Sequence, residues 1–183
     1  MSLKHGLLGL LNYGEMTGYE INKTFNNSLD FFWKVQTSQI YRELNYMEKS
    51  GWLTSETVFQ TDKPNKRLYS ITDLGRAELQ KWLLENNFDS EFQIRSAFLM
   101  KIFFSDQKNI KENIEMFRAY KKKCIYELKN LEKANNNIEY YSKETEENNE
   151  SIYWNLTVLY GEKHLKTSIE FADEAVKILE ELL

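Results

Sequence analysis

The distribution of glycine and proline divides this chain of 183 residues into two parts. Six of the seven glycines and the single proline, Pro64, lie within residues 1–75. After Gly75 there is one more glycine, Gly161, and no proline. Because glycine and proline mark turns and proline breaks helices, we expect a compact first part with tight turns and a second part made of long helices.

Apolar residues of the second part, residues 87–183, recur at the spacing of helices that pack along their length. We expect helical segments over residues 90–104, from Asp106 as N-cap to about residue 147, and from about Ser151 onward. Such repeats are buried against other helices, so part of this surface is predicted to pack within the chain and the rest is available to a partner. In the last segment the apolar residues that recur every seven positions are Val158, Leu165, Ala172 and Leu179, with a second series of Ile169, Val176 and Leu183.

Residues 1–86 are predicted to form a winged helix-turn-helix domain, so that the chain as a whole is mainly α. The Pro64-Asn65 pair signals a hairpin turn between two runs rich in β-branched and aromatic residues. The order of elements is that of a winged helix. The expected elements are helices over 2–12, 18–29 and 37–50, the strands WLTSETVF and KRLYSIT, and a helix over 73–86.

Capping residues support these helices. Thr17 and Thr72 are candidate N-caps, and Gly51 is a candidate left-handed C-cap of the third helix. The side chains expected to face the core are Tyr19, Ile21 and Phe25 in the second helix, and Leu74, Leu79, Trp82 and Leu83 in the fourth.

The third helix has two contrasting faces. At 100° per residue, Ile40, Leu44 and Met47 form a narrow apolar stripe. The opposite face and its flanks carry amides, hydroxyls, aromatic rings and two cations; these are Ser38, Gln39, Tyr41, Arg42, Asn45 and Lys49. Such a set suits the major groove of DNA, where arginine pairs with guanine, asparagine or glutamine with adenine, and hydroxyls reach phosphates.

The hairpin adds local positive charge that the formal net charge of −4 conceals. Lys63, Lys66 and Arg67 face only Asp62 there, which suits a wing lying on the phosphates beside the groove. Residues 1–86 hold 10 basic and 10 acidic side chains, so the excess of acid lies in the second part.

The sequence resembles the PadR family of transcriptional regulators. The similar stretches are LKHGLLGLLNYGEMTGYEI, SQIYRELNYMEKSGWL and KRLYSITDLGRAELQKWL, in the family's order and at its distances. The second part resembles the helical dimerisation region of the longer, Vir-like members. The resemblance implies a homodimeric repressor that binds a two-fold symmetric operator in double-stranded DNA, with the third helix in the major groove and the wing on the flanking backbone. It implies recognition residues Ser38, Gln39, Tyr41, Arg42 and Asn45 and wing residues Lys63, Lys66 and Arg67.

Many relatives release DNA when they bind a small, often aromatic molecule, so the resemblance also implies a possible effector. Tyr153 and Trp154 open the last helix and are the candidate effector-binding residues. The alternative for these and the other clustered aromatic side chains is packing in the core and at interfaces, and that alternative is the commoner use of such residues.

Catalysis and metal binding have little support in the sequence. His5 and His164 lack partners at metal-ligand spacing, and no nucleophile motif or phosphate loop is present, so we expect no enzyme, metal or cofactor. Cys124 falls on an apolar stripe, which favours an inert core residue over a redox sensor. A single cysteine and the lack of an apolar run of membrane-spanning length point to a cytoplasmic protein. The alternative function is a winged-helix module that binds protein instead of DNA.

Overall fold

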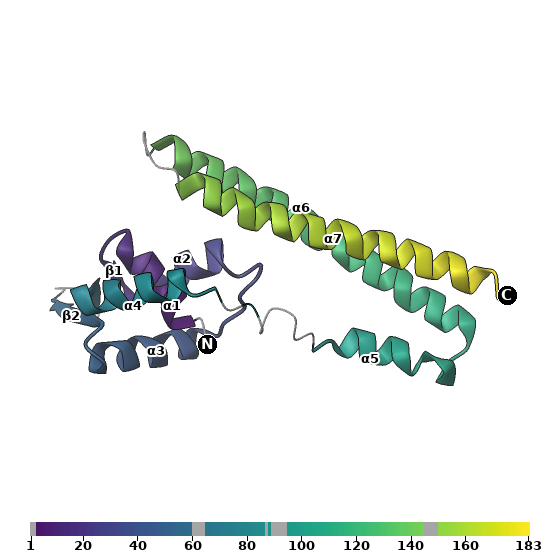
Figure 1. Ribbon diagram of the computed structural model, residues 1–183, viewed down its shortest axis with the longest axis horizontal. Coiled ribbons are helices and arrows are strands. Elements are labelled where there is room, and N and C mark those ends of the chain that lie inside the picture. The colour runs from purple at the N-terminus through teal and green to yellow at the C-terminus, as the bar shows by residue number, and fades with distance from the viewer. Residues whose placement is uncertain (1–2, 60–64, 87, 89–94, 145–149) are drawn as a thin grey trace. The chain divides into compact units, whose positions relative to one another are not determined.

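The computed structural model describes residues 3–59, 65–86, 88, 95–144 and 150–183, with side chains described outside 132–144 and 150–151 (Figure 1). The chain divides into two compact units, Met1–Ser90 and Glu91–Leu183, and each is described by itself.

The first unit has the helix and hairpin order of a winged helix, which confirms the predicted fold class. A short strand that the sequence did not reveal, β1, pairs with β3 and makes a three-stranded antiparallel sheet of order β1-β3-β2. The elements are α1 (Leu3–Asn12), β1 (Met16–Thr17), α2 (Gly18–Ser28), α3 (Thr37–Lys49), β2 (Leu53–Val58), β3 (Lys66–Ile71) and α4 (Asp73–Leu84).

The three predicted caps are confirmed. The Thr17 hydroxyl accepts a hydrogen bond from the Glu20 N–H, and the Glu20 carboxylate accepts one from the Thr17 N–H at 2.8 Å, which forms a capping box. The Thr72 hydroxyl accepts from the Gly75 N–H at 3.1 Å. Gly51 has φ of +72°, the left-handed conformation that ends α3.

The core of the first unit contains most of the residues expected there, with three exceptions. Tyr19, Leu74 and Leu83 are exposed by 70%, 65% and 64% of their surface, so their predicted burial is wrong. The stripes that these helices bury are narrower than the apolar pattern of the sequence. The side chains that are buried or nearly so are Leu7, Leu8, Leu10, Leu11, Ile21, Phe25, Ile40, Leu44, Met47, Leu53, Tyr69 and Leu79.

Two long helices, α6 (Ile110–Glu144) and α7 (Glu150–Glu180), pack side by side and form most of the second unit (Figure 1). The Lys121 ammonium donates to the Asp173 carboxylate at 2.6 Å, and Arg118 donates to Glu180 at 3.0 Å, which ties the two helices together. The buried residues between them are Ile114, Phe117, Cys124, Leu131, Val158 and Ala172. In the predicted heptad series Leu165, Ile169, Val176 and Leu179 are partly buried and Leu183 is exposed.

The start of α6 differs from the prediction. Asp106 lies in a short 3-10 helix, Ser105–Gln107, and the Asn109 side-chain oxygen accepts from the Glu112 N–H at 2.9 Å. Asn109 therefore caps α6 and Asp106 does not, because the extra turn moves the helix start along the chain. The helix expected over residues 90–104 is the shorter α5 (Ala97–Phe103), and residues 90–94 lie outside the described ranges.

A close approach of α4 to the backbone of Trp52, between α3 and β2, requires glycine at position 75. A Cβ there would lie 2.9 Å from the Ile71 side chain and closer still to the Trp52 carbonyl oxygen. Since backbone cannot move aside cheaply, Gly75→Ala is expected to lower the free energy of unfolding by about 1–3 kcal/mol. Gly9→Ala is the control: it meets no atom within 4 Å and is expected to raise stability by about 0.5–1 kcal/mol. Urea denaturation of both variants checks this, and a Gly75→Ala protein as stable as the parent would contradict it.

The burial of His5 makes the stability of the first unit depend on pH. Its ring is buried and stacks on Trp82 at a centroid distance of 4.5 Å, as expected for a packed histidine. Burial lowers the pKa of His5, although Nε2 lies 3.3 Å from the Glu78 carboxylate and Lys4 pairs with the same carboxylate. The unfolded chain therefore takes up a proton near the ordinary pKa while the folded chain resists it, so stability is lost as pH falls through that value.

We expect the melting temperature to fall between about pH 7.5 and pH 5.5, the range in which an unperturbed histidine titrates. His5→Phe keeps a flat ring against Trp82 and is expected to show a smaller fall. Thermal melting of both proteins across this range is the measurement, and equal slopes for the two would contradict the role of His5.

Candidate nucleic-acid interface

Burial of one face of α3 determines which side chains reach solvent. Ile40, Leu44 and Met47 are completely buried, which confirms the predicted inward stripe. The opposite face is exposed along the whole helix, while Glu43 and Glu48 on its flanks are partly buried. The exposed candidates are Ser38, Gln39, Tyr41, Arg42, Asn45 and Lys49.

Gln39 and Tyr41 also have structural contacts. The Gln39 side-chain oxygen accepts from the Gln36 N–H at 3.0 Å, at the start of α3. The Tyr41 ring lies against Gly18, where a Cβ would come within 2.6 Å of it. Glycine at position 18 thus leaves the space that the tyrosine ring occupies at the flank of the exposed face.

The hairpin supplies part of the predicted positive charge. Lys66 and Arg67 begin β3, in register with Val58 and Thr57 of β2, and both are exposed. Lys63, the third predicted wing residue, lies outside the described residues.

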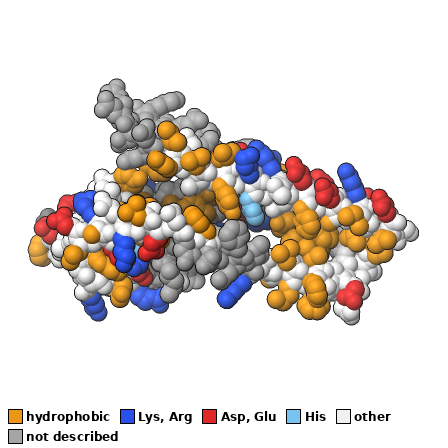
Figure 2. All heavy atoms as spheres, in the orientation of Figure 1, with side chains coloured by type: hydrophobic (Ala, Val, Ile, Leu, Met, Phe, Trp, Pro, Cys, Tyr) orange, Lys and Arg blue, Asp and Glu red, His pale blue; other side chains and the backbone are white. Residues whose placement is uncertain are grey.

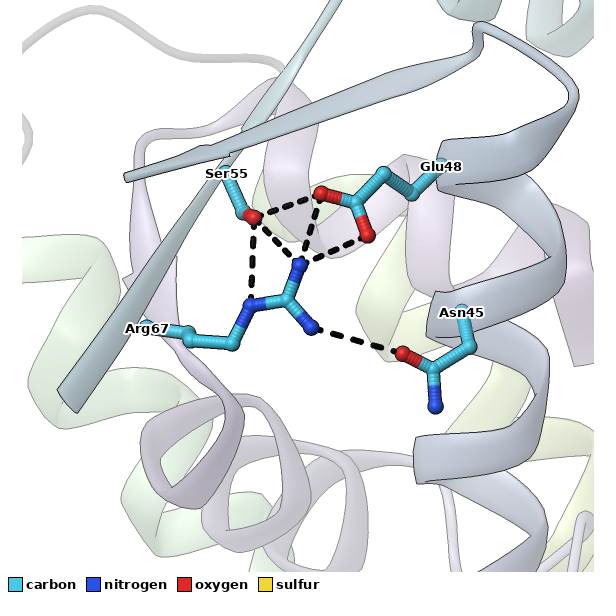
Figure 3. A network of polar contacts seen from close by, with 4 residues as sticks. All are labelled: Asn45, Glu48, Ser55 and Arg67. Atoms are coloured by element: carbon cyan, nitrogen blue, oxygen red, sulfur yellow. Dashed lines mark hydrogen bonds and ion pairs between the residues drawn. The ribbon is translucent and has the colours of Figure 1, made fainter. Parts of the chain in front are cut away.

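Arg67 belongs to a polar network that joins the hairpin to α3 (Figure 3). Its Nη2 donates to both Glu48 carboxylate oxygens at 2.7 Å and to the Ser55 hydroxyl at 2.7 Å. The Ser55 hydroxyl donates to Glu48 Oε1 at 2.6 Å, and Arg67 Nη1 lies 3.5 Å from the Asn45 side-chain oxygen. The network therefore brings together two predicted site residues, Asn45 and Arg67, with two that were not predicted, Glu48 and Ser55.

The network changes the charge of the surface. The Ser55 hydroxyl, followed by Arg67, lowers the pKa of Glu48, and the Glu48 carboxylate raises the pKa of Arg67, so both stay ionised near neutrality. The arginine charge is thus balanced locally. Arg42, Lys49 and Lys66 are exposed cations on the same two elements, and no ion pair to them is formed within the described part of the chain.

The predicted effector residues lie on different sides of α7. Tyr153 is exposed by 68%, whereas Trp154 is partly buried. An open groove of about 300 Å³ lies elsewhere on the second unit, and neither residue lines it. The groove is lined by Phe117, Arg118, Lys121, Lys122, Ile125, Ala172, Asp173 and Val176.

The second unit exposes a large apolar surface. Figure 2 shows hydrophobic side chains gathered around α5, where Phe103 is 81% exposed. A second exposed apolar set follows one face of α7 near its start. The α5 set is Leu99, Met100, Phe103 and Phe104, and the α7 set is Ile152, Tyr153, Leu156, Leu159 and Tyr160.

Two other side chains with reactive groups, Cys124 and His164, pack against their neighbours in the second unit. Cys124 is buried, and burial raises the pKa of its thiol, which disfavours the reactive thiolate. His164 stacks on Tyr160 at the surface of α7. Within the described ranges, no group of three or more His, Cys, Asp and Glu side chains could hold a metal ion. None of the described helices is long and apolar enough to cross a membrane.

Comparison with known proteins finds similarity over both units. Residues 7–81 match the sequence model of the "Transcriptional regulator PadR-like family", and residues 94–180 match "Virulence activator alpha C-term". The "Negative transcriptional regulator PadR" of Bacillus subtilis (strain 168) is 34% identical over 130 residues, which are 71% of each chain.

Two crystal structures of Bacillus subtilis PadR are similar in fold. The complex with operator DNA has a TM-score of 0.82 and 26% identity, over 98% of this chain and 99% of that chain. The complex with p-coumaric acid has a TM-score of 0.76 and 25% identity, over 98% and 99% of the two chains.

Proposed function

The chain belongs to the PadR-like family of transcriptional regulators, and we propose that it is a homodimeric repressor that binds a palindromic operator. The observation that carries the proposal is the exposed polar and basic face of α3, set beside the hairpin by the burial of Ile40, Leu44 and Met47. The similar PadR that was crystallised with operator DNA supports the same role for this chain.

In the proposed complex α3 lies in the major groove and the hairpin lies on the neighbouring phosphates. Arg42 and Asn45 point away from the core at the centre of the exposed face and reach base edges. The hydroxyls and amide at the start and flanks of the helix, with the remaining cations, position the domain on the backbone. These positioning residues are Ser38, Gln39, Tyr41, Lys49, Lys63 and Lys66. Arg67, the remaining wing residue, contacts Glu48 and Ser55 of its own domain.

Repression is favoured by the name of the Bacillus subtilis relative, a negative regulator. A repressor needs no catalytic group or cofactor, and we assign the chain none. Since it acts on chromosomal DNA, we place it in the cytoplasm.

Dimerisation is supported by the exposed apolar sets on α5 and α7. Apolar surface of this extent on a helical unit is normally covered by a partner. Two readers bound to half-sites one helical turn, about 34–36 Å, apart must be held rigidly, and long packed helices provide that rigidity. A second copy of the chain is therefore the proposed partner.

A small aromatic effector is the last part of the proposal. The complex of Bacillus subtilis PadR with p-coumaric acid supports an effector of this class. Tyr153 and Trp154 remain the candidates, because these two consecutive residues place one exposed and one partly buried aromatic ring at the start of α7.

Selection of bound duplexes from a random pool tests DNA recognition directly. We expect a palindrome to be enriched, and Arg42→Ala to relax the preference at one base pair per half-site by about 1–3 kcal/mol. Lys66→Ala is expected to weaken all sequences alike and to flatten the slope of log K against log[salt] by about 0.9. Lys81→Ala, an exposed residue of α4 outside both elements, is the matched control. A folded dimer that enriches no sequence would favour the protein-binding module.

Charge introduced into the α7 apolar set tests dimerisation. Leu156→Glu with Leu159→Glu is expected to convert the dimer to monomer and to lower operator affinity by at least tenfold, since an unpaired carboxylate cannot be buried cheaply. Lys129→Glu, an exposed residue on the side of α6 away from Cys124, is the control. Analytical ultracentrifugation gives the mass, and a double variant that stays dimeric would show that this face lies outside the interface.

A further inference from the structure

The Arg67 guanidinium is surrounded on several sides by its own domain. Nη2 contacts Glu48 and Ser55, and Nε lies 3.2 Å from the Ser55 hydroxyl. Its Cζ also lies 5.3 Å from the centre of the Tyr69 ring, a side chain in the core. An arginine that binds a phosphate needs N–H donors that are free at the surface. Here two of the three guanidinium nitrogens, Nε and Nη2, already donate to groups of the protein.

The third nitrogen, Nη1, faces the Asn45 side chain. Guanidinium groups only donate hydrogen bonds, so the Asn45 side chain turns its oxygen toward Arg67 Nη1, at 3.5 Å. The Asn45 amide nitrogen then points away from the network (Figure 3). A free asparagine presents either end, whereas this one presents its two N–H donors.

Resting on the proposed DNA binding, we propose that Arg67 is a positioning residue that makes Asn45 a reader of hydrogen-bond acceptors. Glu48 and Ser55 hold the guanidinium, and the guanidinium holds the amide oxygen. The exposed amide donates to guanine O6 or N7, thymine O4 or adenine N7 in the major groove. It does not form the two-bond pair with adenine, because that pair needs the amide oxygen turned toward the base edge and here the oxygen is turned toward Arg67. For the same reason the contact with the cytosine amino group is disfavoured.

The alternative for Arg67 is a phosphate contact of the wing, and charge separates the two roles. Arg67→Lys keeps the positive charge but cannot contact Glu48, Ser55 and Asn45 together, because an ammonium lacks the planar fork. Arg67→Met removes the charge and keeps an unbranched side chain of similar length. Lys66→Met, at the neighbouring exposed position, serves as the reference for loss of a phosphate contact.

The experiment begins with random-pool selection for the full chain and for Asn45→Ala, which identifies the base pair that Asn45 reads. Affinities for the four base pairs at that position are then measured at several salt concentrations for the three variants above. Thermal melting verifies that each is folded.

We expect both Arg67 variants to lose the preference at the Asn45 position, from roughly tenfold, the usual order for a base pair that is read, toward none. The salt slope of Arg67→Met is expected to equal that of the parent, while Lys66→Met flattens it by about 0.9. If the selected pair is A·T, the adenine is replaced by purine, a base that lacks the 6-amino donor. The protein is expected to bind this duplex within about twofold of its affinity for the parent duplex, because it makes no contact to the 6-amino group.

Several outcomes would overturn the inference. These are a flattened slope for Arg67→Met, an unchanged preference in Arg67→Lys, an Asn45→Ala protein with the parent's preference, or a large loss of affinity with purine. Failure of the proposed function itself is a different result: the parent chain would then enrich no sequence at all, and the inference would fall with it.

Discussion

Burial of Ile40, Leu44 and Met47 is the constraint on which the proposed DNA-binding surface depends. These three side chains lie on one side of α3 and are completely removed from water, so the helix cannot rotate about its axis without exposing them. Their burial places Arg42 and Asn45 outward. The core and the binding surface are therefore two sides of one packing arrangement, and changes to the stripe would alter both.

The attachment of the hairpin to α3 relies on polar contacts. Arg67, Glu48 and Ser55 are partly exposed, and ion pairs of this kind add little to stability, roughly 0–1 kcal/mol. Their value lies in geometry, because a planar guanidinium bound on several sides restricts the neighbouring asparagine. A weak contribution to folding is thus compatible with a strong effect on which bases the domain prefers.

The second unit buries some of its apolar side chains and leaves others exposed. A single pair of long helices buries residues such as Phe117 and Val158 between them, and leaves apolar side chains exposed on α5 and on the first turns of α7. In an isolated chain these apolar side chains would stay in contact with water, which is unfavourable. A second copy that covers them would hold two winged helices together, so burial of this surface and recognition of a symmetric operator would be linked.

The amino-acid sequence by itself determined the features that depend on neighbours along the chain. The inward stripe of α3, the caps at Thr17, Thr72 and Gly51 and the hairpin could all be read from it, because helical periodicity and capping involve residues at most a few positions apart. It overestimated burial at Tyr19, Leu74 and Leu83, since an apolar pattern does not reveal how wide a stripe the rest of the fold will cover. It assigned the α6 cap to Asp106, because nothing local distinguished it from Asn109.

Only the tertiary structure decided the contacts between distant residues. β1 is two residues long and exists because Met16 and Thr17 meet β3 more than 50 positions later. Arg67, a predicted wing residue, meets Glu48 across 19 positions and so belongs to a polar network within the domain. Neither pairing has a periodic signal, since both arise when the packed core brings the strands and α3 together.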